Sequence, residues 1–225
     1  MSDPTPTADE NTPPRIRDMP APRESTGLAA KPMRAVFTWP YRLVLAGAYR
    51  AGFRPWHLTL MALLTNMVMG AMLLRGEYLI AGLLLIPGGL FDILDGAVAR
   101  LRGEVSRFGA FLDSVFDRIS DVILFGCLYW SLAGQDLRLE AGLALVTLVT
   151  ALMVSQIRAE AEALGAELTE GYFQRLERWV AMMIGIPIPH MLLPMLGLLT
   201  VLGSVTVAQR AWSAVARVGA VEGGS

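Results

Sequence analysis

Four aspartates, Asp92, Asp95, Asp113 and Asp117, lie between two stretches that are among the most apolar of the chain. They lie in FDILDGAVARLRGEVSRFGAFLDSVFD, residues 91–117, between the runs YLIAGLLLIPGGL and VILFGCLYWSLAG. A carboxylate inside an apolar, membrane-spanning segment is costly, so such a residue usually has a function. The position of these aspartates therefore predicts a functional site.

The acidic residues form one stripe on each of two expected helices. Positions 92 and 95 are about 60° apart on a helix, and Gly96 and Ala99 share their face. The second stripe repeats every four residues and consists of Gly109, Asp113, Asp117 and Asp121. The short polar link RLRGEVSR allows the two helices to run antiparallel, so we expect the stripes to face each other.

This arrangement predicts a site for divalent cations. Four neighbouring carboxylates repel one another, and bound cations relieve that repulsion. The ligand atoms are all oxygen, without cysteine or histidine, which favours Mg²⁺ or Mn²⁺. Their number suits two metal ions about 4 Å apart that hold a phosphate. For Asp121 an alternative stays open, pairing with an arginine such as Arg100, Arg102 or Arg118.

The rest of the chain is organised as membrane helices. Hydrophobic residues make up 54% of the 225 residues and charged residues 17%, against about 25% charged in soluble domains. The apolar residues are gathered into long runs, so the predicted fold is an all-α integral membrane protein. It has six transmembrane helices preceded by an interfacial amphipathic helix. The interfacial helix is expected at 32–50 and the spans at 55–74, 78–100, 108–133, 139–157, about 174–189 and 192–212.

The segments outside this membrane domain, 32–217, are predicted to be tails. Residues 1–31 are rich in Pro, Thr and Ala and lack an apolar period, which indicates disorder, and 218–225 are expected to be flexible. Six spans place both termini on one side, together with most of the arginines. The positive-inside rule makes that side cytoplasmic, in the cell membrane, and puts the acidic cluster there as well. A net charge of −1 gives no general attraction to nucleic acid.

The acidic residues also carry a family resemblance. Asp92-x2-Asp95-Gly96-x2-Ala99-Arg100-x8-Gly109-x3-Asp113-x3-Asp117 resembles the signature of the CDP-alcohol phosphatidyltransferases at all eight fixed positions. The resemblance covers most of 32–215. It implies a membrane enzyme that transfers a phosphatidyl group from CDP-diacylglycerol to a small alcohol, using divalent metal and releasing CMP. It also implies a homodimer among membrane lipids.

The resemblance assigns roles to individual residues. Asp92, Asp95 and Asp113 would hold the metals, and Asp117 would be the catalytic base and also contact metal. The CDP-binding residues that it implies are Thr59, Asp92, Gly96, Arg100 and Gly109. Thr59 belongs to a Pro-x-x-x-Thr segment seen at a helix start in many members, for which an ordinary capped helix start is the alternative.

Three arginines in residues 155–180, Arg158, Arg175 and Arg178, predict an acceptor that itself carries a phosphate. A guanidinium group suits a phosphate because it can make two charge-assisted hydrogen bonds to it. The alternative is that these arginines anchor the cytoplasmic side. In that case they would pair with neighbouring acids of the segment, Glu160, Glu162 and Glu177.

The same segment resembles the phosphatidylinositol phosphate synthases of the family through Gly171, Arg175, Glu177 and Arg178. That resemblance implies inositol 1-phosphate as the acceptor. However, Glu160 stands where an arginine is usual. Glycerol 3-phosphate, the acceptor of a phosphatidylglycerophosphate synthase, is therefore the nearest alternative.

A cation-coupled membrane transporter would also carry carboxylates inside the membrane. Such proteins show internal repeats and polar residues that reach across both leaflets. In this chain the acids gather at one side, no convincing repeat is found, and VILFGCLYW is apolar. The transporter is therefore the less favoured hypothesis.

Overall fold

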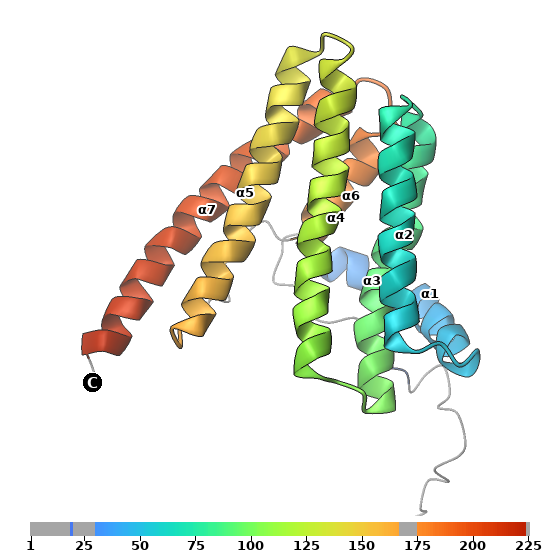
Figure 1. The fold of residues 1–225 in the computed structure, drawn as a ribbon, viewed down its shortest axis with the longest axis vertical. Helices are drawn as coiled ribbons and strands as arrows, with labels where there is room; N and C mark the ends of the chain where they lie inside the picture. Colours follow the sequence, from blue (N-terminus) through green and yellow to red (C-terminus); the bar gives the residue numbers. More distant parts are fainter. Residues whose placement is uncertain (1–18, 20–29, 167–174, 224–225) are drawn as a thin grey trace, which may run out of the picture.

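The computed structural model describes Met19, residues 30–166 and residues 175–223. Within these ranges the chain forms seven helices and no strand, which confirms the all-α prediction (Figure 1). The helices are α1 (Ala30–Arg50), α2 (Pro55–Leu74), α3 (Tyr78–Arg102), α4 (Arg107–Ala133), α5 (Arg138–Ala163), α6 (Arg175–Gly185) and α7 (Leu192–Gly223).

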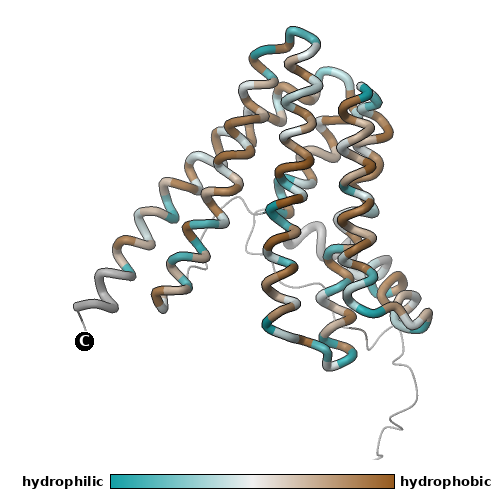
Figure 2. The backbone as a smooth tube through the Cα atoms, in the orientation of Figure 1, coloured by the Kyte–Doolittle hydropathy of each residue, from teal (hydrophilic) through white to brown (hydrophobic). Residues whose placement is uncertain are grey.

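Four of the described helices are long and apolar enough to cross a membrane. They are α2, α3, α5 and the part of α7 from Leu192 to Arg217. The α6 and α4 helices are not among them. The α6 helix has only 11 residues. The α4 helix has 27 residues, but charged side chains interrupt its first half. Figure 2 shows hydrophilic positions interrupting the hydrophobic colour of α4 and α5 in their lower parts.

The helices pack in a continuous series that brings distant parts of the sequence together. The α2 helix packs on α3 and α4, α4 packs on α5, and α5 packs on α7. The short α6 contacts both α3 and α7, and α1 lies against α3. In Figure 1, the α3–α4 loop and the C-terminal end of α7 lie at the same end of the molecule as α1.

Small residues of α3 allow α6 and the turn after it to approach closely. A Cβ atom on Gly82 would lie 2.6 Å from Cδ of Pro187, closer than real Cβ contacts. A Cβ on Gly89 would lie 3.2 Å from the ring of Trp179 in α6. Because Trp179 is one turn from Arg175, this contact fixes the start of α6 beside the acidic end of α3.

The predicted N-terminal tail falls largely outside the described residues. Residues 1–18 and 20–29 lie outside, as does the segment 167–174 with Gly171. Met19 is described and is buried, in one cluster with Tyr41 and Leu45 of α1 and Leu94 of α3. At the other end, α7 is helical through Gly223, within the predicted tail 218–225.

Candidate active site

A tight turn joins the two acidic helices. The α3 helix ends at Gly103, whose φ of 66° lies in the left-handed region that favours glycine. The α4 helix begins after Ser106, whose Oγ accepts a hydrogen bond of 3.0 Å from the backbone N–H of Gly109. Gly109, predicted to bind CDP, is thus part of the first turn of α4.

The structure brings three of the four predicted metal ligands together. Carboxylate oxygens of Asp92 in α3 and of Asp113 and Asp117 in α4 all lie within 4.8 Å of one another. Oδ1 of Asp117 is buried and accepts no hydrogen bond of normal geometry. A set of three carboxylates from two helices fits a hard divalent cation. We call these three residues the carboxylate triad.

Asp95 points elsewhere. Its Oδ2 accepts a hydrogen bond of 2.7 Å from Oγ1 of Thr59 in α2, and the residue is 6% exposed. Asp95 is therefore not a member of the triad in this structure, although it lies one turn from Asp92. Thr59 is more than part of a helix start, because its hydroxyl joins α2 to the signature segment of α3.

A guanidinium group bridges the carboxylate triad. Nη1 of Arg175 lies 2.5 Å from Oδ2 of Asp92 and 2.5 Å from Oδ1 of Asp117. Its Nη2 lies 3.2 Å from the other oxygen of Asp92. The group also lies over the ring of Trp179, 5.6 Å from the centroid, at a distance typical of cation–π contacts. Arg175, predicted to bind acceptor phosphate, is thus placed on the predicted metal ligands.

Arg178 forms a second ion pair one turn further along α6. Its Nη2 donates a hydrogen bond of 2.8 Å to Oδ2 of Asp121. The pairing of Asp121 with an arginine is therefore observed, but the partner comes from α6 and is none of Arg100, Arg102 and Arg118. Arg118 instead donates to the Oγ and carbonyl oxygen of Ser114 in its own helix.

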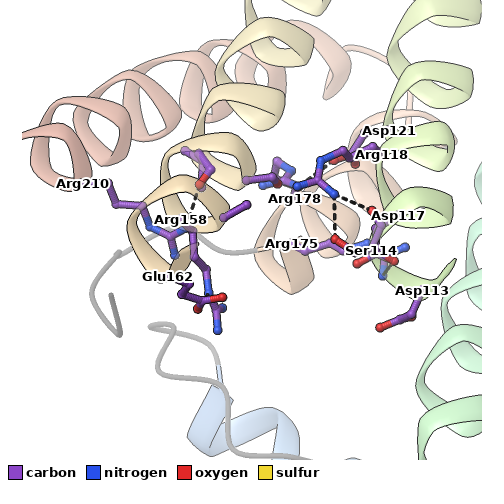
Figure 3. A pocket seen from close by; sticks show the side chains of 13 residues that line it. Asp113, Ser114, Asp117, Arg118, Asp121, Arg158, Glu162, Arg175, Arg178 and Arg210 are labelled. Atoms are coloured by element: carbon purple, nitrogen blue, oxygen red, sulfur yellow. Dashed lines mark hydrogen bonds and ion pairs between the residues drawn. The ribbon is translucent and has the colours of Figure 1, made fainter. Parts of the chain in front are cut away.

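A pocket of about 360 Å³ opens beside the triad, between α4, α5, α6 and α7. Figure 3 shows the acidic residues of α4 on one side, Arg158, Glu162 and Arg210 on the other, and Arg175 and Arg178 between them. All three predicted acceptor arginines line it. They are joined by Arg210 of α7, which donates to the carbonyl oxygen of Val154 and is 5% exposed.

Arg210 was not among the site residues predicted from the sequence. Its only signal was that it ends a run, 179–209, without any Asp, Glu, Lys or Arg. An ionisable residue at the end of such an apolar run is a candidate functional residue, because burying its charge is costly. Its proximity to Arg158, which is more than 50 residues away in the sequence, depends on the packing of α5 on α7.

The acids of α5 divide between two faces. Nε of Arg158 lies 2.7 Å from Oε1 of Glu162, and both residues line the pocket. The Arg158–Glu162 pair is one of the pairs expected if the arginines of this segment anchor the cytoplasmic side, which is the alternative to phosphate binding. Glu160, which departs from the resembling pattern, accepts a hydrogen bond of 2.6 Å from Gln156 and does not line the pocket.

Gly96 and Arg100, both predicted to bind CDP, lie together on α3. A Cβ atom on Gly96 would lie 3.4 Å from Nη1 of Arg100, an ordinary contact distance. The guanidinium group therefore lies beside the glycine, on the same face of the helix as the signature residues.

Comparisons with known proteins agree with this geometry. The sequence model described as CDP-alcohol phosphatidyltransferase matches residues 53–217. A phosphatidylinositol phosphate synthase from Mycobacterium marinum is 35% identical over 207 residues, which cover 84% of this chain and 85% of the relative.

Two solved structures are also similar. Both are crystal structures of the phosphatidylinositol phosphate synthase of Mycobacterium tuberculosis, at 32% identity. One has CDP-DAG bound, with a TM-score of 0.68, and covers 76% of this chain and 91% of that one. The other is in complex with manganese and citrate, with a TM-score of 0.69, and covers 76% and 87%.

Proposed function

Because the chain belongs to the CDP-alcohol phosphatidyltransferase family, we propose that this phosphatidyltransferase uses CDP-diacylglycerol and inositol 1-phosphate as its substrates. The observation that carries the proposal is the arginine-lined pocket directly beside the carboxylate triad. A phosphorylated alcohol in this pocket would have its phosphate on guanidinium groups and a hydroxyl near carboxylates.

The triad residues Asp92, Asp113 and Asp117 would hold divalent cations, Mg²⁺ or Mn²⁺, with Asp95 as the fourth predicted ligand. When bound, the metal polarises the phosphate group and stabilises the charge on the departing CMP oxygen. The donor set supports this role, since it consists only of carboxylate oxygens from two helices.

Asp117 would act as the general base, because it belongs to the triad and also lines the pocket. It would accept the proton of the acceptor hydroxyl. The hydroxyl oxygen then forms a bond to the phosphorus that carries diacylglycerol, and the bond from that phosphorus to the CMP oxygen breaks. Arg158, Arg175 and Arg178, together with Arg210, would bind the acceptor phosphate during this step.

The CDP part would lie against the signature face of α3. Thr59, Asp92, Gly96, Arg100 and Gly109 are its proposed contacts. Thr59 supports this role through its hydrogen bond to Asp95, because the bond fixes α2 against that face. The acyl chains would remain in the bilayer while the nucleotide enters from the side that carries the arginines.

We further propose that α2 to α7 are six spans, that α1 lies in the interface, and that the site faces the cytoplasm at the inner membrane. The end of the molecule that holds the site also carries Arg100, Arg102 and Arg107, as the positive-inside rule requires of a cytoplasmic end. The homodimer rests on the family resemblance and stays a prediction.

The acceptor is tested with the purified protein in nanodiscs, labelled CDP-diacylglycerol and Mn²⁺. Inositol 1-phosphate, glycerol 3-phosphate, inositol and serine are supplied separately, and the lipid products are identified. We expect CMP release and a phosphorylated inositol lipid with inositol 1-phosphate alone. A lipid product with glycerol 3-phosphate only would show that glycerol 3-phosphate, and not inositol 1-phosphate, is the acceptor. No CMP release with any acceptor would contradict the proposed phosphatidyltransferase activity.

A further inference from the structure

Arg175 lies on the atoms that a metal ion would need. Its guanidinium group contacts oxygens of Asp92 and Asp117, two members of the carboxylate triad. A divalent cation held by the triad would bind through these same carboxylates. The positive guanidinium group and a positive ion cannot share them, because at such distances they repel each other and compete for the same lone pairs.

The position of Arg175 gives it a second place to bind. The residue lines the arginine pocket together with Arg118, Arg158, Arg178 and Arg210. Each of the other four has a partner outside the triad: Ser114, Glu162, Asp121 and the Val154 carbonyl oxygen, respectively. Arg175 is therefore the pocket arginine whose present partners are the triad carboxylates.

From this geometry we propose that Arg175 couples metal binding to acceptor binding. It pairs with Asp92 and Asp117 until these hold a divalent cation, and it then turns into the pocket and binds the acceptor phosphate. Trp179, over whose ring the guanidinium group lies, is a fixed support for this movement because it is packed on α3.

This arrangement has a thermodynamic consequence. The pairing of Arg175 lowers the apparent affinity for metal, because only the fraction of molecules with released carboxylates can bind it. An anion that holds Arg175 in the pocket increases that fraction. Metal and acceptor phosphate must therefore strengthen each other's binding by the same factor.

The inference rests on the proposed function but is tested by binding rather than turnover. Free Mn²⁺ is titrated against the full-length protein in nanodiscs and measured by electron paramagnetic resonance, without substrate. We expect R175Q to bind Mn²⁺ at least about tenfold more tightly than the wild type, since one charge-assisted pair accounts for roughly that factor.

The matched control is R118Q. It removes the same charge close to Asp117, but Arg118 bonds only within its own helix in the contacts described above. We expect R118Q to change the Mn²⁺ affinity by no more than about twofold, because its charge is only partly buried and is screened by solvent and salt. R175K keeps a positive charge but lacks the guanidinium group that contacts both carboxylates, so its Mn²⁺ affinity should lie between those of R175Q and the wild type.

A second titration measures the coupling in the wild type and in R175Q. Inositol 1-phosphate should tighten Mn²⁺ binding by the wild type at least about fivefold, a typical coupling, and this factor should fall toward one in R175Q. Equal effects of R175Q and R118Q, weaker Mn²⁺ binding by R175Q, or no coupling in the wild type would each overturn the inference. CMP release by the wild type with Mn²⁺ would in those cases still support the proposed function, so the two failures are distinguishable.

Discussion

Arg178 of α6 and Asp121 of α4 form a buried ion pair, with Nη2 and Oδ2 2.8 Å apart and side chains 6% and 3% exposed. The two residues are 57 positions apart in the sequence. The pair fixes α6 against α4 and holds one arginine at the edge of the pocket. It is therefore a structural contact, and it also positions an arginine that we propose binds the acceptor phosphate.

Asp121→Ala should destabilise the protein by about 3–5 kcal/mol, because it leaves the buried charge of Arg178 without a partner. The measurement is the free energy of unfolding in mixed micelles. The control is Glu162→Ala, which removes the partner of Arg158 in a half-exposed pair and should cost about 0.5 kcal/mol or less. Equal stability of the two variants would contradict the structural role of the Arg178–Asp121 pair.

Thr59→Val should lower kcat/KM for CDP-diacylglycerol by roughly 10- to 100-fold. The variant keeps the shape of the side chain but removes the hydrogen bond to Asp95, a bond to a charged group. Thr59→Ser should retain most of the activity. In Thr65 the hydroxyl donates to the Met61 carbonyl oxygen of its own helix, so Thr65→Val should stay within about twofold of the wild type. If Thr59→Val were as active as Thr65→Val, the hydrogen bond from Thr59 to Asp95 would have no role in activity.

Gly82→Ala should destabilise the protein by about 1–3 kcal/mol, because the added methyl group would meet the rigid ring of Pro187. The same substitution at Gly126, where nothing lies within 4 Å of the added atom, should be neutral or stabilising by up to about 1 kcal/mol. Thermal unfolding of both variants in one detergent provides the comparison. A neutral Gly82→Ala would show that α6 does not depend on this close approach.

Glu160→Arg should change the KM for inositol 1-phosphate by no more than about threefold, because position 160 lies off the pocket and on the side of Gln156. Arg210→Gln should raise the same KM at least about tenfold, since it removes a buried pocket guanidinium. If Glu160→Arg instead lowered KM tenfold, the acceptor phosphate would bind on a different face of α5.

The sequence predicted the helices closely, because apolar runs and breakers determine them locally. The expected span 55–74 coincides with α2, and the expected interfacial helix 32–50 is close to α1. The largest difference is in α7, which continues to Gly223 rather than ending at 212. The α5 helix also continues beyond its predicted end at 157, to Ala163, because the polar residues after 157 remain helical. The number of membrane crossings does not follow from the apolar runs alone, since α4 carries charges and α6 is short.

The site was only partly predictable, for physical reasons. Helical periodicity placed Asp113 and Asp117 on one face, and the turn after α3 brought them to Asp92, as predicted. Periodicity could not show that Asp95 bonds to Thr59, nor that Arg175 bridges the triad, because these contacts depend on the packing of helices distant in sequence. The same limit applied to Arg210.

Asp113→Asn tests most directly the proposal that the carboxylate triad holds the metal for phosphatidyl transfer. Asp113 is the exposed member of the triad, so the substitution should leave the fold intact. The measurement is Mn²⁺-dependent CMP release from CDP-diacylglycerol with inositol 1-phosphate. We expect a loss of at least about a hundredfold, because one metal ligand is removed. A folded Asp113→Asn protein that releases CMP at the wild-type rate would contradict this proposal.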